Sequence, residues 1–84
     1  MLNLTQVRQY LKLARQNKSA VIKELFAFDF MYEDDRYDIL DIFCAKSFSE
    51  AWQSFWTLDT IVRDHTLEII EQALPTLCEE VRSC

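Results

Sequence analysis

Residues 24–46 read ELFAFDFMYEDDRYDILDIFCAK, and this stretch shapes both the core and the charge of the chain. Ten of the eleven aromatic residues lie between Phe26 and Trp56, so the hydrophobic core has to be assembled around this region. The same stretch carries seven carboxylates, and six of them lie among the aromatic residues, at Asp29, Glu33, Asp34, Asp35, Asp38 and Asp41. The rest of the chain is therefore organised around an aromatic segment that is also acidic.

The chain has 84 residues, which is enough for one domain spanning residues 1–84. A domain of this size is only marginally stable unless its core is dense, and here half of the residues are apolar. This apolar content is generous for so short a chain. We therefore expect a homodimer, or a protein partner that covers leftover apolar surface.

The chain contains no glycine and a single proline. Tight hairpins rely on glycine because it adopts positive φ cheaply, and phosphate-binding loops need it for close backbone approach. Both features are therefore excluded. Helices joined by short polar turns are the economical architecture.

The apolar spacing agrees with this expectation. Residues 3–16 have the pattern of an amphipathic helix that Asn3 or Thr5 caps. Glu33-Asp34-Asp35 is expected as the loop and N-cap of a helix over residues 35–45, and Ser47 with Glu50 forms a capping box. We predict an all-α fold, a compact bundle of four to five helices, in which the last helix is kinked or broken near Pro75.

Residues 20–32 are ambiguous between helix and strand. Phe26, Phe28, Phe30 and Tyr32 alternate, which is the period of a strand. The flanking residues favour helix, and a hairpin without glycine is unusual, so we favour helix. A helix would place Asp29 between two apolar arcs, where the carboxylate needs either a buried partner or a position at an interface.

The net charge of −5 is unevenly distributed. Residues 1–23 carry five basic residues and no acid, whereas residues 24–84 carry fourteen acids and four basic residues. Arg8, Lys12 and Arg15 form a basic face on the first helix, with the same spacing as the acidic row Asp34, Asp38 and Asp41. We interpret each row as solvated, or as facing the other within the fold or across a dimer axis. Direct nucleic-acid binding is disfavoured because the overall field repels phosphates.

No residue pattern indicates catalysis or metal binding. His65 is the single histidine, so any Cys–His or Ser–His pair would have to use it, and no second feature converges on it. Cys44 and Cys78 lie in apolar contexts and are expected in the core. We predict no enzyme activity, no metal, no cofactor and no membrane span. The odd cysteine count without a leader favours a cytoplasmic location.

The most economical function is that of a small acidic regulatory module, homodimeric and without enzyme activity, that binds a protein. The residues expected to bind the partner are Asp29, Glu33, Asp34, Asp35, Asp38 and Asp41, together with the neighbouring aromatic side chains. The alternative is an acidic inhibitor of the kind that phages and plasmids produce. Carboxylates one helical turn apart can imitate a nucleic-acid backbone and block a restriction, CRISPR or repair enzyme.

Overall fold

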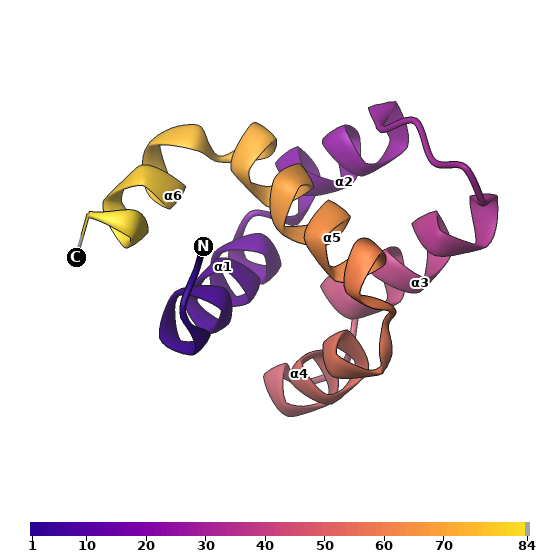
Figure 1. The fold of residues 1–84 in the computed structure, drawn as a ribbon, viewed down its shortest axis with the longest axis horizontal. Coiled ribbons are helices and arrows are strands. Elements are labelled where there is room, and N and C mark those ends of the chain that lie inside the picture. The colour runs from indigo at the N-terminus through magenta and orange to yellow at the C-terminus, as the bar shows by residue number, and fades with distance from the viewer. Residues whose placement is uncertain (84) are drawn as a thin grey trace.

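The computed structural model describes residues 1–83, and these residues form six helices with no strand. α1 spans Leu4–Gln16, α2 Lys18–Ala27, α3 Glu33–Phe43, α4 Phe48–Thr57, α5 Thr60–Ala73 and α6 Pro75–Arg82. α5 runs through the middle of the molecule and packs against α1, α2, α3 and α6 (Figure 1). The prediction of an all-α fold is confirmed, whereas the predicted count of four to five helices is too low.

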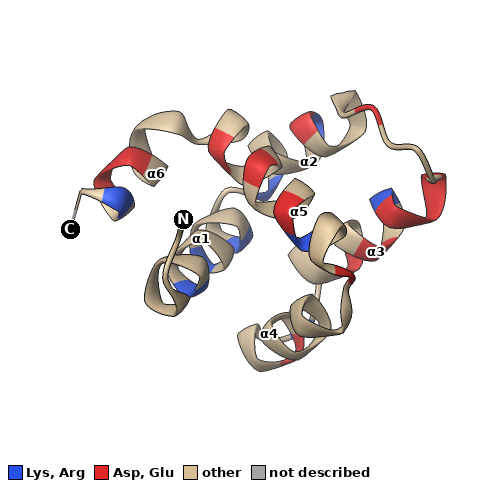
Figure 2. Cartoon of the chain, in the orientation of Figure 1, with Lys and Arg blue, Asp and Glu red and all other residues tan. Residues whose placement is uncertain are grey.

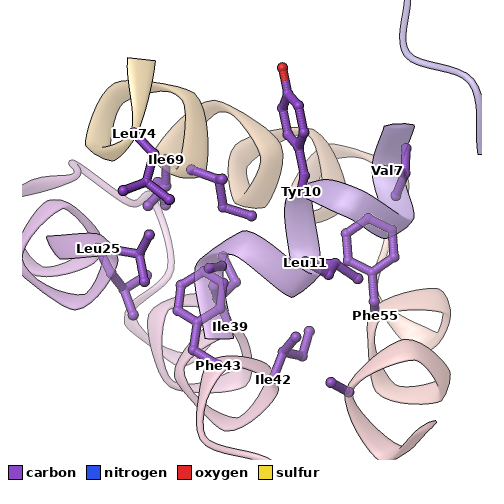
Figure 3. Packing of buried hydrophobic residues seen from close by; sticks show 14 of the residues in the cluster. Val7, Tyr10, Leu11, Leu25, Ile39, Ile42, Phe43, Phe55, Ile69 and Leu74 are labelled. Carbon is purple, nitrogen blue, oxygen red and sulfur yellow. The ribbon is translucent and has the colours of Figure 1, made fainter. Parts of the chain in front are cut away.

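A single cluster of buried apolar side chains joins all six helices. Figure 3 shows Leu11 of α1, Leu25 of α2, Phe43 of α3 and Phe55 of α4 converging on one interior. α3 contributes Ile39, Ile42 and Phe43, which are fully buried.

Two helices begin at capping residues and a third begins at proline. Asn3 caps α1 in a reciprocal capping box, in which the backbone N–H of Gln6 donates to Asn3 Oδ1 at 2.8 Å. Ser47 caps α4 by accepting from the backbone N–H of Glu50 at 3.2 Å. The expected break at Pro75 is confirmed. Pro75 is the first residue of α6, where its missing N–H has no helical partner to lose.

Residues 20–32 are only partly helical. α2 continues to Ala27, and Phe28 then adopts an extended backbone with φ −73° and ψ 139°. Phe28 and Phe30 are half-buried, whereas Asp29 and Met31 between them are exposed. The helix prediction is therefore wrong beyond Ala27, and the alternation reflects an extended connection rather than a strand.

The acidic tripeptide after this connection also differs from expectation. Glu33, Asp34 and Asp35 form the first turn of α3, whereas we expected a loop and N-cap. Tyr32 is the N-cap and contributes no side-chain hydrogen bond. Carboxylates in a first turn interact favourably with the partial positive charge of the helix N-terminus, and this explains the earlier start.

Side-chain donors, rather than left-handed residues, complete several helix C-termini. Within residues 1–83 no residue has a positive φ, so the glycine-type C-cap is missing from this part of the chain. Instead, guanidinium N–H groups donate to carbonyl oxygens near three helix ends. Arg36 donates to Leu25 O of α2 at 2.5 Å, Arg15 to Ile42 O of α3 at 3.2 Å, and Arg63 to Leu58 O after α4 at 2.6 Å.

A polar network connects α1, α5 and α6 at the edge of the core. The buried Tyr10 hydroxyl donates to Glu71 Oε2 at 2.8 Å and accepts from Arg82 Nη1 at 3.0 Å, and Arg82 also forms an ion pair with Glu71. Burial, followed by the hydrogen bond to Glu71, raises the pKa of Tyr10 well above its ordinary value. Burial also raises the pKa of the nearby Cys78 thiol.

Arg15→Ala should lower the free energy of unfolding by about 1–2 kcal/mol, because it removes a charged donor from a partly buried carbonyl. Lys18→Ala is the matched control. Lys18 lies exposed on α2, and its removal should cost less than about 0.5 kcal/mol. Urea denaturation of both variants measures the difference. Equal stabilities would show that the Arg15 hydrogen bond contributes nothing to the fold.

The raised pKa of Tyr10 predicts a loss of stability in alkali. Above the ordinary tyrosine pKa of about 10, the unfolded chain releases the Tyr10 proton while the folded chain retains it, so stability falls as pH rises. The contribution of this group is at most about 1.4 kcal/mol per pH unit. Urea midpoints should therefore fall less steeply in Tyr10→Phe than in the wild type. The control Tyr37→Phe, at an exposed position, should follow the wild type, and parallel curves for all three would contradict the argument.

Candidate protein-binding surface

Large apolar side chains are exposed where α2 is connected to α3. Met31 is 86% exposed, Tyr32 64%, Tyr37 51% and Phe26 49%. The rings of Phe26 and Tyr37 meet edge to face with their centroids 6.2 Å apart, so the two helices contribute to one surface. We call this surface, with the carboxylates of Asp29 and Asp34 beside it, the acidic–aromatic patch. The α2–α3 connection lies at one end of the molecule (Figure 1).

Arg36 packs against the side chains that support this patch. Its guanidinium lies 5.4 Å from the ring centroid of Phe26 and 5.0 Å from that of Phe30. Its Nε donates to Glu33 Oε1 at 2.6 Å, and its Nη1 donates to Leu25 O. The hydrogen bond with Glu33 raises the pKa of Arg36 further above its already high ordinary value, so the guanidinium stays charged. The patch therefore has a defined support rather than resting on a loose loop.

The structure distributes the six acidic residues of the sequence prediction over two surfaces. Asp29, Glu33 and Asp34 lie at the patch, where all three are exposed and Glu33 forms an ion pair with Arg36. The conflict expected at Asp29 disappears because α2 ends two residues before it. Figure 2 shows the acids concentrated on α3 and along α5.

The remaining carboxylates line a separate acidic groove of about 350 Å³ between α3 and the α4–α5 connection. Asp35, Asp38 and Asp41 of α3 contribute to it together with Asp59, which precedes α5. Asp34 does not line this groove, so only Asp38 and Asp41 of the predicted row at 34, 38 and 41 contribute to it. Within residues 1–83, no group of three or more His, Cys, Asp or Glu side chains is arranged to hold a metal ion.

The basic face of α1 is directed at neighbouring helices. The Arg8 guanidinium lies 4.8 Å from the centroid of Phe48, and Lys12 Nζ lies 5.4 Å from the same ring. Arg15 donates to Ile42 O of α3. Among the ion pairs of residues 1–83, none joins this face to the acidic row. Arg8 and Lys12 lie instead near the Phe48 ring, whose quadrupole attracts cations.

The nucleophile and base candidates do not form a site. His65 packs against the rings of Phe28 and Phe30, with centroids 5.0 and 6.0 Å away, and its Nδ1 is buried without a hydrogen-bond partner. Cys78 is buried as expected and its Sγ lies 3.7 Å from Ile70 O, whereas Cys44 is exposed, contrary to expectation. Cys44 follows the last residue of α3, where the core face of that helix has already ended.

A second apolar surface lies between α1 and α6. This α1–α6 groove has a volume of about 450 Å³ and is lined by Leu13, Leu77 and Val81 with the amides of Gln6 and Gln9. Glu80 is the one lining residue with a formal charge. The groove is therefore nearly neutral, unlike the rest of this acidic molecule.

Sequence reasoning missed Met31 and Arg36 as contributors to a binding surface. Met31 was not assigned to the apolar face of a predicted helix, and Arg36 was a single basic residue in an acidic stretch. The alternation of Phe28, Asp29, Phe30 and Met31 was the available signal. An extended chain with that period buries its aromatic residues and exposes Met31, which is what the structure shows.

Comparison with protein-family models, with curated proteins and with solved structures finds no match to this chain. Each helix within residues 1–83 is too short or too polar to cross a lipid bilayer.

Proposed function

We propose that this protein is a small regulatory module that acts by binding another protein through the acidic–aromatic patch, and not by catalysis. The observation that carries the proposal is the exposure of four large apolar side chains, Met31 and Tyr32 in the α2–α3 connection and Phe26 and Tyr37 in contact beside it. Contiguous exposed apolar side chains on a soluble domain mark interaction sites, because water contact with them is unfavourable. The free thiols of Cys44 and Cys78 support a reducing, cytoplasmic setting.

The polar rim supports the same function. Asp29 and Asp34 are exposed beside the apolar centre, and neither forms an ion pair in the described chain. An apolar centre with a polar rim is the usual anatomy of a protein–protein interface. Both carboxylates are therefore available to a partner.

A photo-crosslinking amino acid, benzoylphenylalanine, placed at position 31 should trap a protein partner in the cells that make this protein. The same probe at Ser49, an exposed position on α4, is the matched control and should trap nothing in common with it. Tyr32→Ser combined with the probe at position 31 should reduce the yield about tenfold, since it removes a large apolar contact. Equal trapping from positions 31 and 49 would contradict the proposed surface.

The acidic groove supports a second candidate, inhibition of a nucleic-acid-handling enzyme by charge imitation. Asp35, Asp38 and Asp41 lie at successive helical turns, and Asp59 extends the negative surface beyond α3. If this candidate is correct, a probe at Ser54, in the wall of the groove, traps a nuclease or a DNA-binding protein. That complex would dissociate at high salt, because charge pairing is screened.

We also propose that the protein forms a homodimer, and that the α1–α6 groove is its contact. A two-fold contact brings identical patches face to face, so a charged centre would oppose its own copy. The groove avoids this repulsion because its lining is almost entirely uncharged. Symmetric pairing through the acidic–aromatic patch would instead bring Asp29 and Asp34 of both copies together.

Light scattering over a concentration series should show a dimer at high micromolar concentration. Leu77→Asp should shift the population to monomer, because it introduces a charge that meets its own copy in the groove. Ile61→Asp is the matched control, since Ile61 is an exposed apolar residue of α5 that does not line the groove. A wild-type protein that stays monomeric at every concentration would exclude the dimer.

A further inference from the structure

The proposed function leaves the chemistry of the partner open, and the charges around the patch restrict it. Asp29 and Asp34 lie beside the exposed aromatic residues, while the nearby Arg36 is already engaged by Glu33. The side chain of Arg36 is only 11% exposed, so it offers little positive charge to a partner. The surface that a partner meets at the patch is therefore apolar in the centre and negative at the edge.

We infer that the partner of the acidic–aromatic patch is a basic amphipathic segment of another protein, with apolar side chains along one side and lysine or arginine beside them. This inference rests on the proposed function. Apolar side chains would cover Met31 and Tyr32, and the basic side chains would reach Asp29 and Asp34. Neither contact alone suffices, because exposed ion pairs contribute little and an apolar contact without charge gives no orientation.

The patch is suited to a range of such segments. Met31 has the highest exposed fraction of the four apolar side chains, and an unbranched thioether adapts its shape to different partners. The aromatic side chains around it are less adaptable, because Arg36 stacks on Phe26 and Phe26 meets Tyr37 edge to face. Aromatic side chains that are already held in place lose less conformational entropy on binding. Met31 can adjust its shape to partners of different sequence.

Other occupants fit the charges less well. A second copy of the chain would oppose Asp29 and Asp34 to themselves across a two-fold axis. An anionic lipid surface and a nucleic acid would both be repelled by the same carboxylates. Complementary charge therefore selects a basic protein segment.

The test is fluorescence anisotropy with a short, labelled, helical peptide of leucine and lysine, titrated with the full chain. The wild type should bind it. A peptide with glutamate in place of lysine, and one with serine in place of leucine, should both fail to bind. Binding of the glutamate peptide, of anionic vesicles or of duplex DNA in preference to the lysine peptide would overturn the inference.

Matched variants locate the binding. Asp29→Asn with Asp34→Asn should weaken binding of the lysine–leucine peptide about fivefold. The control, Asp64→Asn with Glu79→Gln, changes the net charge by the same amount on α5 and α6 and should have little effect on binding. Met31→Ser with Tyr32→Ser should weaken binding of the peptide about tenfold. Both positions are exposed enough to leave the fold intact. Equal losses in both charge variants would show a general field effect and overturn the inference.

The two proposals fail separately. If crosslinking at position 31 traps a partner whose contact segment carries no lysine or arginine, protein binding at the patch stands and the basic chemistry is wrong. If the lysine–leucine peptide binds the wild type and the Met31 and Tyr32 variant equally, the patch is not its binding site and the inference is wrong.

Discussion

The absence of glycine is the constraint on which the rest of the structure depends. A helix that ends without a left-handed residue leaves carbonyl groups that need other donors, and in this protein arginines provide them. Arg15 reaches from α1 to the end of α3, and Arg36 reaches from α3 back to the end of α2. Each hydrogen bond therefore completes one helix and also fixes it to another.

This solution links the electrostatics of the chain to its folding. The basic residues of α1 contact neighbouring helices, with Arg8 and Lys12 near Phe48 of α4 and Arg15 on the α3 terminus. Arg36 contacts two rings, one carboxylate and one carbonyl, and so supports the α2–α3 connection. Most acids, by contrast, remain on the surface. The molecule therefore presents carboxylates to solvent while several of its guanidinium groups act as structural donors.

The same arrangement explains why the two exposed apolar surfaces differ. Asp29 and Asp34 border the acidic–aromatic patch at the α2–α3 connection, whereas amides border the α1–α6 groove. Identical copies tolerate a neutral contact, and a different, basic molecule complements an acidic one. The proposed self-association and the proposed partner binding therefore use surfaces of different charge.

The sequence by itself determined the helical class, the start of α4 at Ser47 and the break at Pro75, because caps and proline act over a few neighbouring residues. It limited the cap of α1 to Asn3 or Thr5, and the structure shows Asn3. Only the tertiary structure decided that α2 ends at Ala27, that Asp29 is exposed, and that Asp35 rather than Asp34 joins the acidic groove. The end of α2 depends on Arg36, which donates to Leu25 O from the next helix, and the groove depends on the packing of α3 beside the α4–α5 connection. The alternation at residues 28–31 is compatible with an extended segment, but contacts between separate helices decide the outcome.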